Sequence, residues 1–250
     1  MELFFLEFLE NLVSVYSFGN IKYFGSLYVS VPVALFFVFF PLSYITGKRL
    51  MSEDIANDFV IYWFRNTFLG FIVGMFVYAF LATFIPFEKA NFLGQVPLFV
   101  QIPVYYLIIE FLAYAWHMSL HHFNFLWGIH KKHHENYQLN YANSHRDSFL
   151  NMTMFIIFVK LSVETFDIQF LTFLITLTIH EVLSALSHFG TEWDFGRWGY
   201  FFLSPRFHND HHRAVLEAKK EELPMIGNFG ASLSFFDYLF RTTLKGRFKP

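Results

Sequence analysis

The chain has 250 residues, of which 55% are apolar and only 15% charged, which excludes an ordinary soluble domain and predicts an integral membrane protein. The net charge is −2 and no stripe of lysine and arginine is present, so nucleic acid is not an expected partner. Cysteine is absent, which excludes disulfides, thiolate metal sites and iron–sulfur clusters, so any metal would be bound through nitrogen and oxygen.

Four apolar regions are long enough to cross a membrane, because a span needs about 20 apolar residues. Before them, residues 1–20 carry three glutamates and no signal-peptide pattern, and we interpret this segment as an interfacial amphipathic helix. The fourth region is interrupted by charges and is interpreted as two helices that meet at a turn near Asp167. The regions are Tyr23–Ile45, Asn66–Ile85, Phe92–Trp116 and Phe149–Phe189. We expect about four transmembrane helices, the last pair being a full hairpin or a shallower re-entrant one.

The positions of lysine and arginine predict the orientation, because cytoplasmic flanks of membrane spans are enriched in these residues. Basic residues lie between the first two spans and after the third, whereas the loop 86–91 has one: Lys48, Arg49 and Arg65, then Lys131, Lys132 and Arg146, against Lys89. We therefore expect the loop 46–65 and the C-terminal half to be cytoplasmic.

Nine of the twelve histidines form three short groups, and none of the twelve precedes residue 117. The first group is HxxxHH and the other two are HxxHH: His117, His121 and His122; His130, His133 and His134; His208, His211 and His212. Residues three and four apart share one face of a helix, and neutral imidazole binds iron, zinc, copper and nickel. A lone histidine on an apolar helix is more often a packed core residue than a ligand. Three spaced groups beside a bilayer instead indicate a metal site, and they supply too many ligands for one ion.

Two other classes of membrane protein also use histidines. A metal transporter should place them near the middle of several spans, and a di-haem cytochrome needs axial histidines on facing spans. Here the three groups lie outside the apolar runs. They can meet at one end of the helices, as metal ligands do in helical bundles.

These residues resemble the fatty acid hydroxylase and sterol desaturase superfamily of membrane-bound di-iron oxygenases. The stretch "EFLAYAWHMSLHH" is similar to the family's D-x-x-x-Y-x-x-H-R-x-x-H-H, with Glu110 and Met118 replacing Asp and Arg. "HKKHH" matches the second histidine box, and "SPRFHNDHH" followed by "NFGASLSFFDYLFRT" resembles the closing elements, with Asn228 and Asp237 in register. "SALSHFGTEW" resembles the family's lone-histidine segment, which implies His188 as a further ligand. The resemblance runs from about residue 105 to 243.

The resemblance implies an all-α integral membrane protein whose cytosolic helical cap holds a di-metal site. Residues 1–104 would form the N-terminal interfacial segment and transmembrane helices, and residues 105–250 the catalytic region of one structural domain. The cofactor implied is two iron ions with O₂ as co-substrate, although zinc would accept the same ligands. The implied ligands, with no further catalytic residue, are His117, His121, His122, His130, His133, His134, His188, His208, His211 and His212. Residues expected to support the ligands are His145, His180, Glu181, Glu110, Asn228 and Asp237.

Two histidines outside the groups have two interpretations each. His145 aligns with a family element in only one of two registers. It would either touch the metal, or lie at the surface or behind a ligand that it supports. His180 lies about 12 Å along a helix from His188, too far to share an ion. It would either orient a ligand, with Glu181 beside it, or form a buried structural pair.

The function implied is hydroxylation, desaturation or ether cleavage of a lipid from the bilayer. Sterol-like, ether-lipid, fatty acyl and carotenoid substrates stay open, and the HxxxHH opening favours the sterol desaturase-like and alkylglycerol monooxygenase-like branches. Ser184 stands where some fatty acid hydroxylases have histidine, which weighs against fatty acid 2-hydroxylation. Electrons would come from a separate reductase with a ferredoxin or cytochrome. The lack of a fused domain favours a bacterial inner membrane over endoplasmic reticulum, and the alternative function is a histidine-rich metal transporter or metal-binding protein.

Overall fold

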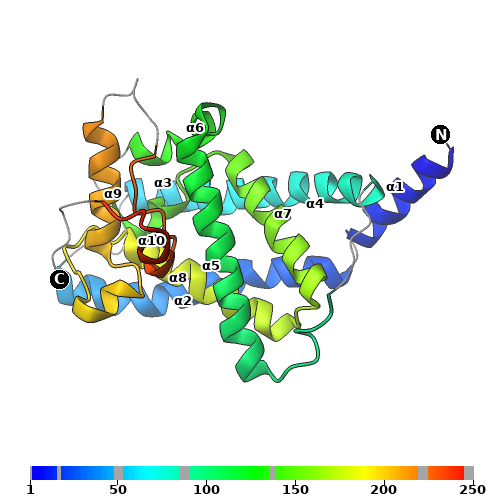
Figure 1. The fold of residues 1–250 in the computed structure, drawn as a ribbon, viewed down its shortest axis with the longest axis horizontal. Helices are drawn as coiled ribbons and strands as arrows, with labels where there is room; N and C mark the ends of the chain where they lie inside the picture. The colour runs from blue at the N-terminus through cyan, green and yellow to red at the C-terminus, as the bar shows by residue number, and fades with distance from the viewer. Residues whose placement is uncertain are drawn as a thin grey trace.

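The computed structural model of the chain describes residues 2–15, 18–47, 53–84, 90–135, 139–218 and 225–244 (Figure 1). These residues are nearly all helical, and their one β-bridge joins Phe202 to Leu233. The helices are α1 (Glu2–Val15), α2 (Phe18–Thr46), α3 (Glu53–Asp58), a π-helix (Phe59–Asn66), α4 (Thr67–Phe84), α5 (Leu98–His122), α6 (Asn124–His130), α7 (Phe149–Phe166), α8 (Phe170–Ser187), α9 (Pro205–Glu217) and α10 (Phe235–Phe240). Short 3₁₀ turns occupy His133–Glu135, Tyr141–His145 and Gly196–Tyr200. The all-α prediction is confirmed.

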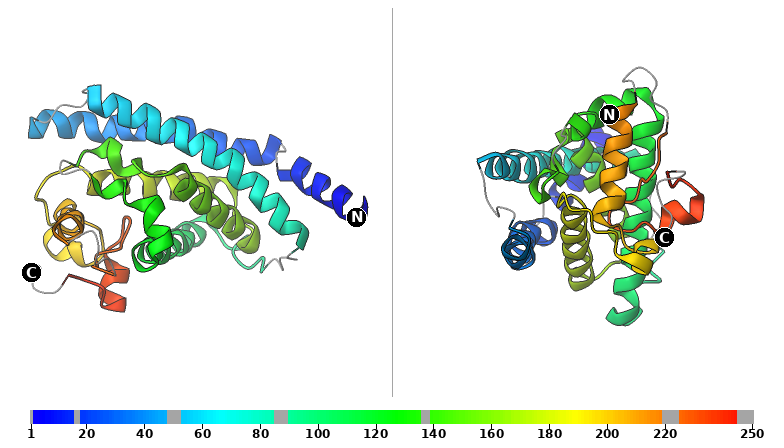
Figure 2. Two further views of the ribbon diagram at one scale, coloured as in Figure 1. Left: turned by 90° about the horizontal axis from the view of Figure 1, so that it is seen from above. Right: turned by 90° about the vertical axis from the view of Figure 1, so that its left-hand side faces the viewer.

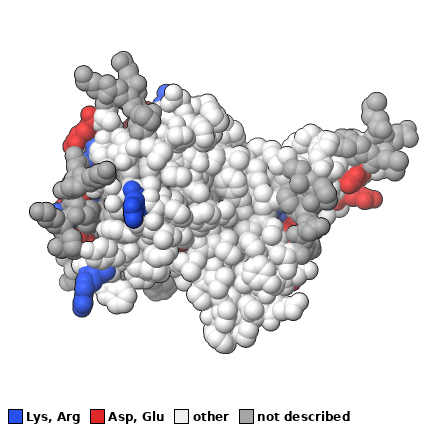
Figure 3. Space-filling view, in the orientation of Figure 1, with Lys and Arg blue, Asp and Glu red and all other residues white. Residues whose placement is uncertain are grey.

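By length and composition, five helices among the described residues could cross a membrane. They cover Gly25–Thr46, Phe64–Phe84, Leu98–His122, Phe149–Phe166 and Phe170–Ser187. The expected spans are therefore present, and both helices of the fourth apolar region reach spanning length, as in a multi-pass membrane protein. Figure 3 shows few charged side chains on the face in view, as expected for a surface that lies against lipid. Lys48, Arg49 and Lys89, which the predicted orientation uses, lie outside the described residues.

Helices α7 and α8 are joined by a turn at Asp167, where the backbone is left-handed at φ 53°, so the predicted turn is confirmed. From this turn the two helices diverge and pack mainly on other helices rather than on each other (Figure 1). On one side α4 packs on α7, and on the other α2 and α5 pack on α8. The GxxxG pair Gly70 and Gly74 faces α7 at close range, because a Cβ on Gly70 would lie 2.9 Å from Met152 Cβ. These glycines serve packing between two helices of one chain.

Helix α5 crosses α2 and α4 steeply: it stands upright in Figure 1, while they follow the long axis, and Figure 2 agrees. The five candidate spans are therefore not one parallel bundle. At one end of the long axis, α9, α10 and the connecting segments gather around the C-terminal half of α5 (Figures 1 and 2). Phe229, Leu233 and Phe236 pack there against Tyr114 of α5 and anchor the C-terminal segment.

Three predicted boundaries differ from the structure. The third span begins at Leu98 rather than Phe92, because residues 92–97 form turns and Pro97 precedes the helix. The same helix continues through His122, so it carries the whole first histidine group. Residues 53–65 are helical rather than a loop. The first segment is helical as expected and packs on α4 through Phe8, while its interfacial position stays a prediction.

Candidate metal centre

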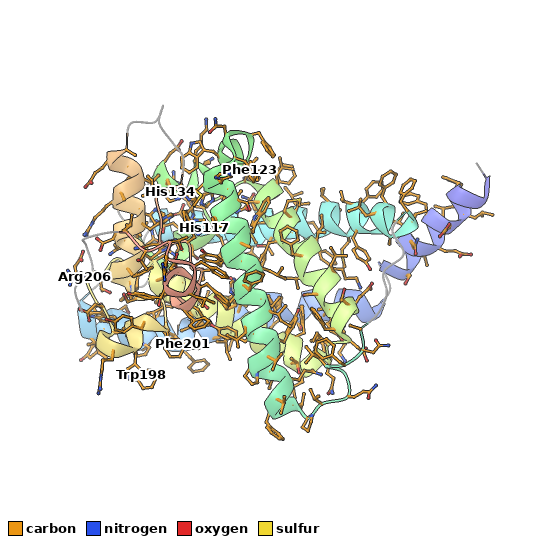
Figure 4. All side chains as sticks on the ribbon, viewed as in Figure 1. His117, Phe123, His134, Trp198, Phe201 and Arg206 are labelled. Carbon is orange, nitrogen blue, oxygen red and sulfur yellow. The ribbon has the colours of Figure 1, made fainter. Side chains whose placement is uncertain are left out.

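Eight histidines form two neighbouring clusters, each able to hold a metal ion. Cluster A contains His117, His121, His130 and His134, and cluster B contains His133, His188, His208 and His212. Within each cluster the candidate ligand nitrogens all lie within 4.8 Å of one another. The clusters adjoin, since the ring centroids of His134 and His212 are 4.4 Å apart. In Figure 4 the labelled His117 and His134 lie between α5 and α9.

The second and third histidine boxes each direct side chains toward both clusters. In the second box His130 and His134 point into cluster A, and His133 points into cluster B. In the third box His208 and His212 belong to cluster B. His211 turns toward cluster A, with its ring centroid 4.8 Å from those of His121 and His134. On α9, His211 lies about 100° around the helix from His212, so the third box can serve two neighbouring sites.

The nitrogen separations fit bound metal ions. Nε2 of His134 lies 3.2 Å from Nε2 of His121 and of His130. In cluster B, Nε2 of His208 lies 2.9 Å from that of His188 and 3.1 Å from that of His212. Four nitrogens about 2.1 Å from one ion, at tetrahedral angles, lie about 3.4 Å from one another. In addition, Nε2 of His117 and of His211 is buried without a hydrogen-bond partner among the described residues.

Burial favours the neutral imidazole, which is the form that binds metal, at His188, at His211 and at four further histidines of the site. Desolvation lowers the pKa of His188 to about 4 and that of His211 to about 3, although each donates to a backbone carbonyl. Desolvation, with mutual repulsion among the imidazoles, lowers the pKa of the other groups outside the spans: His133, His134, His208 and His212. Nine imidazoles and no cysteine make a donor set for iron or zinc.

The loop after α9 orients two histidines from behind. His117 Nδ1 donates to Phe229 O at 2.9 Å, and His211 Nδ1 donates to Gly227 O at 2.8 Å. Asp237 fixes this loop, because its carboxylate accepts from the backbone N–H groups of Phe229 and Gly230. The predicted supporting residue Asn228 does the same from within the loop: its amide donates to Phe207 O and accepts from Leu244 N.

Asp147 is a supporting residue that the sequence reasoning missed. It is buried, and its carboxylate accepts a 2.7 Å hydrogen bond from Nδ1 of His130 in cluster A. The resemblance to the family points to His145 in this segment, and Asp147 follows two residues later. A carboxylate two residues after a histidine was the available signal, but nothing in the spacing connects it to His130.

His180 and His145 each pair with a carboxylate and with no cluster histidine. His180 Nδ1 donates to Glu110 at 2.6 Å, and His145 Nε2 donates to Glu181 at 2.6 Å. Glu110 also accepts from the backbone N–H groups of residues 232 and 233. For His180 the structure shows the buried pair, with Glu110 rather than Glu181 as the partner.

His122 is the one predicted ligand that the structure leaves outside. Its side chain is exposed and packs on Phe123, because it lies about 100° around the helix from His121. His122 is therefore not among the proposed metal ligands.

A chamber of about 130 Å³ opens beside both clusters. It is lined by His117 and His130 of cluster A and by His188 and His208 of cluster B. His145, His180 and Glu181 also line it. A larger apolar groove of about 700 Å³ lies farther along α5 and α7, and its lining includes Phe158 and Phe236.

The chamber and the groove adjoin through one aromatic contact. Trp116 lines the chamber and packs edge-on against Phe158 of the groove, with ring centroids 5.4 Å apart. A chain of methylenes in the groove would thus lie next to the chamber that the histidines face.

Comparison with known proteins agrees with this site. The sequence pattern of the fatty acid hydroxylase family matches residues 102–242, more than half of the chain, and the match includes both clusters. Searches of curated proteins and of solved structures find no match. The chain belongs to the fatty acid hydroxylase family, within the sterol desaturase and fatty acid hydroxylase superfamily, and this family implies that it is an oxidoreductase.

Proposed function

We propose that the protein is an O₂-dependent, di-iron monooxygenase or desaturase that acts on a membrane lipid. The observation that carries the proposal is the pair of four-histidine clusters beside a chamber that adjoins an apolar groove. Two redox-active irons with O₂ and electrons would supply the oxidising power to remove hydrogen from an unactivated C–H bond. His117, His121, His130 and His134 would hold one iron, and His133, His188, His208 and His212 the other.

The chain's own residues would select and position the lipid. The groove around Phe158 and Phe236 is almost wholly apolar, so it suits a hydrocarbon tail drawn from the bilayer. The chamber is lined by Trp116 and by the histidines, which would place one carbon near both clusters. Ser184 lines the chamber in place of a histidine, and with it we favour a sterol-like or ether-lipid substrate.

The proposed enzyme also needs an electron donor and a defined side of the membrane. A separate reductase with a ferredoxin or cytochrome would deliver electrons, because a chain without cysteine has no iron–sulfur cluster of its own. We propose that the metal centre faces the cytoplasm, as the basic residues after the third span predict, and we favour a bacterial inner membrane as the host membrane.

A metal transporter is the alternative from another class. The clusters are built from the last turns of α5, the end of α8 and α9 rather than from mid-helix positions of several spans. This arrangement disfavours a transport pathway. Uptake of radioactive zinc or iron into proteoliposomes would support the alternative.

Metal analysis of the detergent-purified protein tests the proposal. An iron-57 preparation should contain about two irons per chain, with a coupled di-iron signature in its Mössbauer spectrum, and His130→Ala should lose iron while still inserting. Lipids can then be screened for oxidised products with O₂ and a reductant. Absence of bound metal, or full activity of His130→Ala, would contradict the proposal.

A further inference from the structure

The two clusters differ in what supports their ligands from behind. Cluster A has a carboxylate on one ligand, since His130 Nδ1 donates to Asp147, and a backbone carbonyl on another, His117. In cluster B, His188 Nδ1 donates to the carbonyl of Ser184. The other three histidines of cluster B, which are His133, His208 and His212, have a buried Nδ1 with no hydrogen-bond partner among the described residues, as do His121 and His134 of cluster A, so the carboxylate on His130 is what distinguishes the two clusters.

Asp147 is fixed by its own set of hydrogen bonds. The carboxylate accepts from Nδ2 of Asn151 at 2.6 Å and from the backbone N–H of Ser148 at 2.7 Å. The backbone carbonyl of Asp147 accepts from Nδ2 of Asn66, the last residue of the π-helix, at 2.7 Å. Asn151 is itself held by Trp116, whose indole N–H donates to its Oδ1 at 2.5 Å. Asp147 therefore has little freedom to leave His130.

A fixed carboxylate behind an imidazole has two consequences for metal binding. It keeps the proton on Nδ1, so the lone pair of His130 Nε2 is free to bind a metal ion in cluster A. Its negative charge also makes Nε2 more basic, and loss of such a partner typically weakens metal affinity about 10–100-fold. A neutral backbone carbonyl also keeps the proton on Nδ1, but it strengthens metal binding much less than a carboxylate does.

We propose that Asp147 is a positioning residue that makes cluster A the tighter of the two metal sites, so that the sites fill in order. This inference rests on the proposed metal centre but not on the proposed reaction. It predicts that the first equivalent of metal occupies cluster A and that the two metals differ in their electronic surroundings.

Cobalt titration of single-site variants of the full chain tests the inference. His208→Ala with His212→Ala leaves only cluster A intact, and His121→Ala with His134→Ala leaves only cluster B intact. Co²⁺ is the probe, because its visible absorption reports tetrahedral or five-coordinate nitrogen sites. Each background is compared with and without Asp147→Asn, which keeps the size of the side chain and removes its charge.

The cluster A background should bind Co²⁺ about 10–100-fold more weakly with Asp147→Asn, and the cluster B background should be unchanged. The unchanged cluster B affinity also shows that the variant folds. If Asp147→Asn is poorly expressed, Asn151→Leu replaces it. That change removes one hydrogen bond to the carboxylate and should weaken cluster A alone by a smaller factor.

Three results would overturn the inference. Equal weakening of both backgrounds would mean that Asp147 acts on the fold as a whole. No weakening of the cluster A background would mean that the carboxylate does not tune the site, while the metal centre itself stands. No Co²⁺ binding by the unsubstituted protein would contradict the proposed metal centre and the inference together.

Discussion

The metal-free protein should lose stability in mild acid, because burial lowers the pKa of several histidines around the two clusters. Burial lowers the pKa of His188 to about 4 and that of His211 to about 3, whereas unfolded histidine has a pKa of about 6.5. The stability is fully present above pH 6.5 and is lost as the pH falls, because below 6.5 the unfolded chain binds protons that the folded chain does not. Between pH 7.5 and pH 5 each of the two histidines removes about 2 kcal/mol from the free energy of unfolding. The pKa values of His133, His134, His208 and His212 shift in the same direction.

Unfolding in detergent with a chelator, followed by circular dichroism between pH 7.5 and 5, measures this effect. The variant His211→Gln should show a pH dependence about 2 kcal/mol smaller than that of the parent over the same range, whatever its stability at pH 7.5. A free energy of unfolding that does not change between pH 7.5 and 5 would refute the reasoning. So would equal slopes for the parent and His211→Gln.

Three substitutions test other parts of the structure. Gly70→Ala should lower the free energy of unfolding by about 1–3 kcal/mol, because the added Cβ would meet Met152 Cβ at 2.9 Å. Gly25→Ala is its control, with nothing within 4 Å, and a similar loss there would show that crowding is not the cause. Glu110→Gln removes one of two acceptor oxygens and should destabilise by about 1–3 kcal/mol with metal content unchanged, as elemental analysis can check. Asp237→Ala releases the loop behind cluster A and should weaken Co²⁺ binding about 10-fold or more; unchanged binding would contradict that role.

Much of the helical framework follows from the sequence, because apolar length alone identifies a membrane-spanning helix. The turn at Asp167 was predictable for the same reason, since it is where charged residues interrupt the apolar run. The beginning of α5 was not, because Phe92 and Leu93 are as apolar as the helix itself. There Pro97 decides the boundary, and the apolar residues before it are used in turns.

The candidate site was predictable as a set of histidines but not as two clusters. Spacing fixes the face of one helix on which a side chain lies, but it does not fix how that helix is rotated against its neighbours. The second box also leaves the helix partway, since α6 ends at His130 and His133 lies in a 3₁₀ turn. The partner of His180 and the contact between Asp147 and His130 join segments that are distant or differently oriented, so a single sequence does not show them.

The chain positions of the two clusters have a consequence for how the protein is made. Cluster A is encoded within residues 117–134 and gains its carboxylate at Asp147, whereas cluster B draws on residues 133–212. At about 5–20 residues per second, a ribosome needs roughly 3–13 s to extend the chain from Asp147 to His212. During that interval α7 and α8 are synthesised while the ligands of cluster A already exist. If the proposed metal centre is correct, a nascent chain would thus have its first site before the second has been synthesised.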